Sequence, residues 1–181
     1  CAEAFIADLA DEAACRALVP AVAARFGRLD AVVNNASAFE PDDAFSAAPA
    51  AMEHHWRANT APAVLLAQAL HAQLKGGAAT GCVVNLLDQK LWSLNPDYFS
   101  YTLSKAALQA ATVMLAQALA PQLRVCGVAP GVTLPSGTMD EAEFAAAHRL
   151  TPLGRSSTPA DIARAVRFLI EAPAITGTTL I

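Results

Sequence analysis

Three short apolar runs constrain what this chain of 181 residues can fold into. They are LDAVVNNAS (29–37), GCVVNLLD (81–88) and LRVCGVAPG (123–131). Apolar residues recur at helical spacing before and between these runs, over residues 11–27, 47–74 and 99–120, and again after residue 158. Continuously apolar strands that alternate with helices indicate a parallel sheet with helices on both faces. We therefore expect one α/β domain, a doubly wound parallel sheet, over residues 1–181.

Local signals refine these elements. Gly27 is a plausible C-terminal cap for the first helix. The segment TPAD places Thr158 at an N-cap, Pro159 at the first helical position and Asp161 at the third, which predicts a capping box. AEAFIAD (2–8) and TGTTLI (176–181) are predicted to be strands at the two ends of the chain.

Composition excludes several classes of protein. The net charge of −4 argues against a nucleic-acid-binding surface. No apolar run approaches the ~18 residues of a membrane span, and nothing at the amino end resembles a signal peptide, so we expect a cytoplasmic protein. We also expect no metal site, because the adjacent His54 and His55 cannot share a helix face. Four scattered cysteines are predicted to be reduced, namely Cys1, Cys15, Cys82 and Cys126.

A tyrosine and a lysine on the third helix are the main sign of chemistry. Tyr101 and Lys105 are four residues apart and therefore share a helix face. A nearby ammonium favours a phenolate, so we expect Lys105 to lower the pKa of Tyr101 and to make it a usable proton donor. Asp88 lies thirteen residues before the tyrosine, at the carboxyl end of a strand, where ligands of such sheets collect.

Several motifs around this pair resemble the short-chain dehydrogenase/reductase family over nearly the whole chain. DLAD (8–11) resembles the adenine-side segment, NNAS (34–37) the NNAG motif, and PGVT (130–133) the loop at the nicotinamide. Asn59 matches the asparagine of the catalytic tetrad, which helps to hold a proton-relay water. The resemblance implies a Rossmann-like fold and the following cofactor-binding residues: Asp8, Leu9, Asn34, Asn35, Ala36, Tyr101, Lys105, Pro130, Gly131, Val132 and Thr133.

One difference from the general family pattern narrows the resemblance to a subgroup of the family. Most members of the family carry serine where this chain has Asp88, and the pteridine reductases carry aspartate. That subgroup also matches Ser37, Phe39 and Tyr98, which would bind the substrate together with Asp88 and Tyr101. The resemblance therefore implies reduction of a pterin C=N bond by hydride from NADPH, with NAD not excluded. Tyr101 would donate the proton, Lys105 would hold the ribose, Asp88 would orient the substrate and Phe39 would stack on it.

Simpler roles remain open for some of these residues. Asp88 could only cap a turn, and Phe39 and Tyr98 could only pack in their loops. A ketone or 3-oxoacyl thioester is the alternative substrate, because the family reduces many carbonyls.

The family's Gly-rich TGxxxGxG fingerprint and its first two strands have no counterpart in the sequence, which matches the family from its third strand to the start of its last. The expectation is a piece of a longer reductase. The alternative of another class is an inactive remnant, at most an oligomerisation module. The helix over 99–120 resembles the family's subunit interface, so we expect a dimer or tetramer of the complete protein.

Overall fold

A four-stranded parallel sheet forms the centre of the protein. The computed structural model describes residues 2–135, 139–149 and 151–181. The strands lie in the order β1 (Ala31–Asn34), β2 (Gly81–Leu86), β3 (Leu123–Val128) and β4 (Thr179–Leu180). Every neighbouring pair is parallel, and β2 pairs with β3 over its whole length. The predicted parallel α/β architecture is confirmed.

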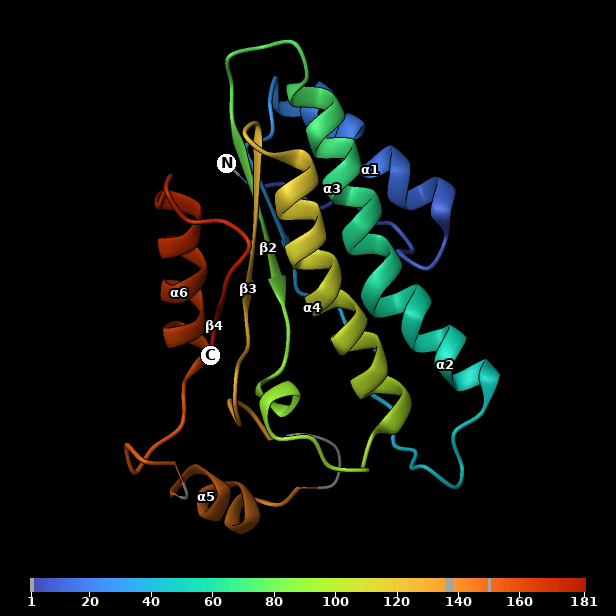
Figure 1. Ribbon diagram of the computed structural model, residues 1–181, viewed down its shortest axis with the longest axis vertical. Helices are drawn as coiled ribbons and strands as arrows, with labels where there is room; N and C mark the ends of the chain where they lie inside the picture. Colours follow the sequence, from blue (N-terminus) through green and yellow to red (C-terminus); the bar gives the residue numbers. More distant parts are fainter. Residues whose placement is uncertain (1, 136–138, 150) are drawn as a thin grey trace.

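Helices cover both faces of the sheet (Figure 1). One face carries α1 (Glu12–Phe26), α3 (Ala61–Leu74) and α4 (Phe99–Leu119), and the other carries α6 (Pro159–Glu171). Because parallel strands need crossover connections, α3, α4 and α6 each return the chain to the starting end of the next strand, and α1 leads into β1. The carboxyl ends of the strands therefore share one edge of the sheet, and α5 (Glu141–Arg149) lies beyond that edge in Figure 1.

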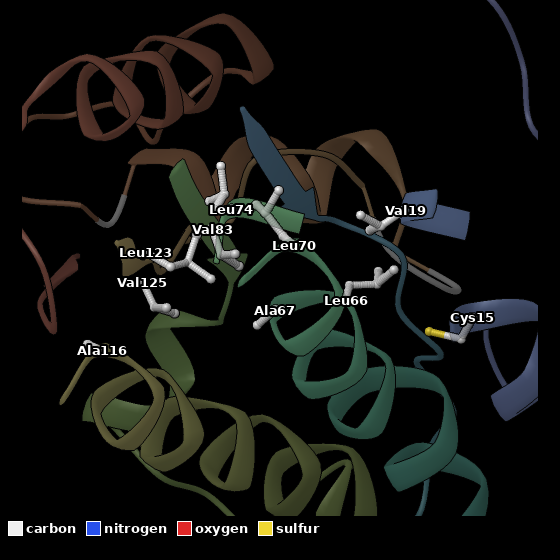
Figure 2. Packing of buried hydrophobic residues seen from close by; sticks show 10 residues of the cluster. All are labelled: Cys15, Val19, Leu66, Ala67, Leu70, Leu74, Val83, Ala116, Leu123 and Val125. Carbon is white, nitrogen blue, oxygen red and sulfur yellow. The ribbon is translucent and has the colours of Figure 1, made fainter. Parts of the chain in front are cut away.

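Alternating side chains of the buried strands build two hydrophobic cores. On β2, Val83 faces α3, whereas Cys82 and Val84 face α6. Figure 2 shows the first core, in which strand residues Val83 and Val125 are grouped with side chains of the covering helices. Full burial of each such aliphatic side chain contributes about 1.5–3 kcal/mol. The sheet is therefore a rigid platform for the residues that follow its strands.

The predicted helix caps are confirmed. Gly27 adopts the left-handed conformation with a φ of 85°, and its N–H donates to the carbonyl of Ala23. At the start of α6, the Thr158 side chain accepts from the Asp161 N–H while the Asp161 carboxylate accepts from the Thr158 N–H.

The helical region predicted over 47–74 is interrupted. It consists of α2 (Pro49–His55), a π-helical turn η1 (Trp56–Thr60) and α3. Pro62 explains the interruption, because it has no N–H to donate to the residue four positions earlier. The wider turn carries Asn59 and buries its side chain.

One local prediction is wrong, and two short helices were not predicted. Residues 2–8 form no strand, since no neighbouring strand among the described residues offers them a hydrogen-bonded ladder. The helix α5 and the short 3-10 helix η2 (Gln89–Trp92) were not predicted, and neither contains a fully buried residue that would give an apolar pattern. Cys15, Cys82 and Cys126 are free thiols, as expected, whereas Cys1 lies outside the described residues. No helix in the described part of the chain is long and apolar enough to span a membrane.

Candidate active site

The segments that follow β1, β2 and β3 lie together at the carboxyl ends of the strands, where residues of all three line one cavity. The Gln89 N–H, just after β2, donates to the carbonyl of Pro130, just after β3, at 3.0 Å. Two adjoining cavities open at this edge, with volumes of about 790 and 600 Å³. Both are lined by Phe39, Leu87, Tyr101, Pro130, Thr133 and Leu134.

Tyr101 and Asp88 are joined directly. The tyrosine Oη donates a 2.7 Å hydrogen bond to Oδ2 of Asp88, and the tyrosine side chain is nearly buried. The other carboxylate oxygen, Oδ1, accepts from the Lys90 N–H at 2.8 Å and thereby caps η2. Asp88 therefore caps a turn and also contacts the phenol. The turn holds the carboxylate still, so the two roles support each other.

Lys105 lies behind the tyrosine ring. Its Nζ donates to the carbonyl of Leu86 at 2.7 Å and lies 5.8 Å from the centroid of the Tyr101 ring. Burial lowers the pKa of Lys105 from 10.5 to about 8, and the charge of Asp88 opposes this change. The ammonium is thus held by a main-chain oxygen at the end of β2.

The expected lowering of the Tyr101 pKa is wrong for this structure. Burial raises the pKa of Tyr101, and the charge of Asp88 and the hydrogen bond to it raise it further. The bonded carboxylate outweighs Lys105, whose ammonium is directed at the carbonyl of Leu86. The phenol is therefore protonated at neutral pH, which is the form that can donate a proton.

The two cavities divide the chemical groups around Tyr101. Lys105 lines only the larger cavity and Asp88 only the smaller one. Tyr101 lines both cavities. A proton on the phenol can therefore reach a ligand in the smaller cavity, while the lysine faces a second ligand in the larger one.

Aromatic rings form one wall of the smaller cavity. Phe39 stacks on Tyr98 with a centroid distance of 4.1 Å and an interplanar angle of 7°, and it meets Tyr101 edge-on at 4.6 Å. Ser37, also predicted to bind substrate, lines the larger cavity instead and donates to Oδ1 of Asn59. The structure thus brings Phe39, Tyr98, Asp88 and Tyr101 together and places Ser37 on the other side.

Asn59 uses its side-chain amide to fix the segment after β1. Its Oδ1 accepts from the Ala38 N–H at 2.7 Å, and its Nδ2 donates to the Ala38 carbonyl at 3.0 Å and to Oγ of Ser104 at 2.9 Å. These bonds tie the segment that carries Phe39 to α4. The relay-water role assigned to Asn59 by resemblance stays a prediction.

A buried polar chain supports Asn34. The Asn34 Nδ2 donates to Oδ1 of Asn85 at 2.7 Å, and the Asn85 Nδ2 donates to Oγ1 of Thr112 at 2.9 Å. Asn85 is fully buried, and sequence analysis did not single it out. The sequence feature that could have identified it is an asparagine within an apolar strand. A buried amide needs hydrogen-bond partners, so such a residue indicates a buried polar chain.

The segment from Pro130 to Thr133 borders both cavities, since Pro130 and Thr133 line both and Gly131 and Val132 line only the smaller one. The Thr133 Oγ1 donates to the Gly131 carbonyl at 2.9 Å and lies 2.9 Å from Oγ of Ser157, while the buried Ser156 donates to the carbonyl of Val132. Ser156 and Ser157 were missed, because nothing in their spacing indicates a contact 24 residues back along the chain.

The remaining predicted cofactor residues lie at the outer edge of β1. Leu9, Asn34, Asn35 and Ala36 line a third cavity of about 350 Å³. Asn35 also lines the cavity of about 790 Å³, so the two adjoin. Asp8 is not part of this lining, and its carboxylate accepts from the Ala10 N–H at 2.9 Å. Within the described residues no group of three or more His, Cys, Asp or Glu is placed to hold a metal ion.

Comparison with known proteins places this chain among oxidoreductases. The model of the enoyl-(acyl carrier protein) reductase family matches residues 1–181. An uncharacterised oxidoreductase of Methylorubrum extorquens is 36% identical over 174 residues, which cover 90% of this chain and 67% of that protein. A putative ketoacyl reductase of granaticin polyketide synthase from Streptomyces violaceoruber is 31% identical over 97% of this chain and 73% of its own length.

A solved structure is also similar. FolM alternative dihydrofolate reductase 1 from Brucella canis, complexed with NADP, shares 40% identity and a TM-score of 0.90. The alignment covers 96% of this chain and 68% of the Brucella chain. The chain thus spans roughly two thirds of these relatives.

Proposed function

Because the chain belongs to the short-chain dehydrogenase/reductase family of NAD(P)-dependent oxidoreductases, we propose that it reduces a pterin-type C=N bond. The observation that carries this proposal is the 2.7 Å hydrogen bond between Tyr101 and Asp88 on the wall of the smaller cavity. A carboxylate at this position suits a ring that presents N–H and amino donors. FolM of Brucella, similar in sequence and structure, is a dihydrofolate reductase.

The larger cavity is the proposed cofactor site. Its volume of about 790 Å³ and its lining by Asn35, Lys105 and Thr133 fit the nicotinamide half of a dinucleotide. When bound, NADPH supplies the hydride. NADP is preferred over NAD because the Brucella FolM structure contains it. Lys105 and the segment from Pro130 to Thr133 would hold the ribose and the nicotinamide amide, respectively, and the edge of β1 with Asp8 and Leu9 would lie toward the adenine.

The smaller cavity is the proposed substrate site. Phe39 offers a flat apolar surface for one face of a planar ring. The Asp88 carboxylate accepts hydrogen bonds from the polar edge of the ring and fixes its orientation toward Tyr101. Tyr101 then donates its proton to the ring nitrogen. The raised pKa of Tyr101 keeps that proton in place until the substrate arrives.

Lys105 supports the charge that develops when Tyr101 gives up its proton. It lies 5.8 Å from the ring centroid and is held by the carbonyl of Leu86. Since its pKa is about 8, it is charged at neutral pH and loses that charge in mildly alkaline solution. Asn59 acts indirectly, because it positions Ala38 beside Phe39.

A carbonyl reductase is the second candidate. It is favoured by the granaticin ketoacyl reductase, which is similar over 97% of this chain. The two candidates differ at Asp88, since a hydroxyl suits a ketone oxygen and a carboxylate suits an N–H array. An inactive remnant that cannot bind cofactor is the third possibility, and an absence of both turnover and cofactor binding would favour it.

The proposal is tested by following NADPH oxidation with dihydrobiopterin, dihydrofolate and a 3-oxoacyl thioester. The chain is assayed beside a form extended to the length of its relatives. We expect pterin turnover, which Asp88→Ser lowers by about 10²-fold or more through loss of the orienting charge. Asp43→Ser is the matched control, because among the described residues the Asp43 carboxylate bonds residues 45 and 46 and no others. Thioester turnover without pterin turnover contradicts the proposal.

We also propose that α4 forms a subunit interface in a homo-oligomer. Leu103 and Met114 on α4 are 48% and 61% exposed, and Met114 joins Trp56 in an apolar groove. Sedimentation of the extended form should show a dimer or tetramer, and Met114→Glu should shift it toward the monomer. A monomeric wild-type protein contradicts this assignment.

A further inference from the structure

The loop that carries Phe39 and the start of α4 contact each other through side chains of both segments. Tyr98 is the N-cap residue of α4, yet it makes no capping hydrogen bond with its side chain. Its ring stacks on Phe39 instead. Tyr98 also has a φ of 54°, a left-handed conformation that is rare for a bulky residue. Strain of this kind persists where surrounding contacts hold it.

Asp42 supplies the cap that Tyr98 does not. Its Oδ1 accepts from the Ser100 N–H at 3.0 Å, its Oδ2 accepts from the Ser100 hydroxyl, and its carbonyl accepts from the Phe99 N–H at 3.4 Å. Asp42 and Ser100 are 58 positions apart in the sequence. A carboxylate at a helix N-terminus satisfies free N–H groups and interacts favourably with the helix dipole.

Phe39 is anchored on its other side as well. Asn59 holds Ala38, and the buried His55 accepts from the Glu40 N–H at 3.3 Å through Nε2. The His55 Nδ1 lies 2.9 Å from the carbonyl of Ala51, which fixes it as the donor nitrogen of a neutral ring. The aromatic wall of the substrate cavity is thus fastened on both sides, with Asp42 as its link to the catalytic helix.

We infer that Asp42 is a positioning residue that sets Phe39 against Tyr101 and so determines affinity for a planar substrate. This inference rests on the proposed function for its substrate class. Asp42 lines neither cavity and acts through the stacked rings of Phe39 and Tyr98. Phe39 lines both cavities, but Tyr98 lines only the smaller one, so the loss of Asp42 should weaken binding of a flat ring more than binding of the cofactor.

The test compares Asp42→Ala, Asp42→Asn and the control Asp43→Ala in the extended protein. Loss of a cap should open the link and raise the KM for dihydrobiopterin by about tenfold, with kcat and the NADPH Kd within about twofold of wild type. Asp42→Asn keeps an oxygen for the Ser100 N–H and should restore KM to within about threefold. Asp43→Ala should resemble wild type.

Hydrogen exchange of the Ser100 amide separates this inference from the proposed function. Asp42→Ala should speed that exchange by about tenfold, whatever substrate the enzyme takes. If Asp42→Ala does not fold, Ser100→Ala, which removes only the hydroxyl bond, should show a smaller change in the same direction. Unchanged exchange, or an equal rise in the KM for pterin and the Kd for NADPH, overturns the positioning role. Faster exchange in an enzyme without pterin turnover overturns only the substrate class.

Discussion

Replacing Lys105 with methionine is expected to stabilise the fold at pH 7. The lysine side chain is 4% exposed, and burial lowers its pKa from 10.5 to about 8. The unfolded chain therefore holds the proton more tightly than the folded chain, and the charged lysine opposes folding. Methionine has a similar length and no charge, so it removes this penalty.

The size of the effect follows from the two pKa values. A fall from 10.5 to about 8 corresponds to about 3 kcal/mol of free energy of unfolding. The hydrogen bond from Nζ to the carbonyl of Leu86, which the variant lacks, contributes about 1 kcal/mol in the opposite direction. We therefore expect a net gain of about 2 kcal/mol at pH 7.

The gain should depend on pH with a definite sign. The penalty is fully present below about pH 8, where both states are protonated, and it is lost as the pH rises to 10.5. Near pH 10.5 the variant should be less stable than wild type by about 1 kcal/mol, because only the lost hydrogen bond remains.

Urea unfolding of both proteins at pH 7 and pH 10.5 measures this difference. The exposed Lys75→Met is the matched control and should change the free energy of unfolding by less than about 0.5 kcal/mol at either pH. A Lys105→Met variant that is destabilised at pH 7, or whose difference from wild type is the same at both pH values, would falsify the reasoning. A stabilised variant should also lose turnover, because the charge that supports Tyr101 is gone.

Three further substitutions test other parts of the molecule. Tyr101→Phe removes the proposed proton donor and should lower NADPH-dependent turnover by about 10²- to 10⁴-fold in a steady-state assay. Asn85→Ala leaves the Asn34 amide and the Thr112 hydroxyl without their buried partner and should lower the free energy of unfolding by about 2–4 kcal/mol in urea. Thr158→Ala removes the capping box of α6 and should lower it by about 1 kcal/mol.

Each of these three predictions has an outcome that would contradict it, and the two stability predictions have control variants. Retention of full turnover by Tyr101→Phe rules out the tyrosine as the proton donor. The exposed Asn95→Ala and Thr80→Ala serve as stability controls for the asparagine and the threonine. An Asn85→Ala protein as stable as Asn95→Ala contradicts the importance of the buried amide chain. For the cap, the contrary result is equal stability of Thr158→Ala and Thr80→Ala.

Much of the fold could be predicted because its signals are local. Continuous apolar strands, the cap at Gly27 and the capping box at Thr158 each depend on a few neighbouring residues, and all were found. The position of Asp88 at the carboxyl end of a strand, where ligands of parallel sheets collect, was read from the sequence, and its pairing with Tyr101 was implied by the family resemblance. The π-helical turn was not predicted although the sequence contains Pro62. The spacing of apolar residues carries no information about a missing N–H donor.

The details of the site depend on contacts that no local pattern encodes. Asp42 reaches Ser100 across 58 residues, and the stack of Tyr98 on Phe39 depends on a left-handed turn. The pKa of Tyr101 was expected to fall because Lys105 is one helical turn away. It rises because burial and the bonded carboxylate dominate, and spacing alone does not reveal where the ammonium points.

Transfer of deuterium from NADPH that carries deuterium at both C4 positions tests the central claim most directly. The extended protein is given labelled cofactor with dihydrobiopterin and a 3-oxoacyl thioester in the same vessel, and both products are analysed by mass spectrometry. The account predicts a tetrahydropterin that carries one deuteron and little labelled hydroxyacyl thioester, with the order reversed in Asp88→Ser. Label found only in the thioester product of the wild-type protein would contradict the account.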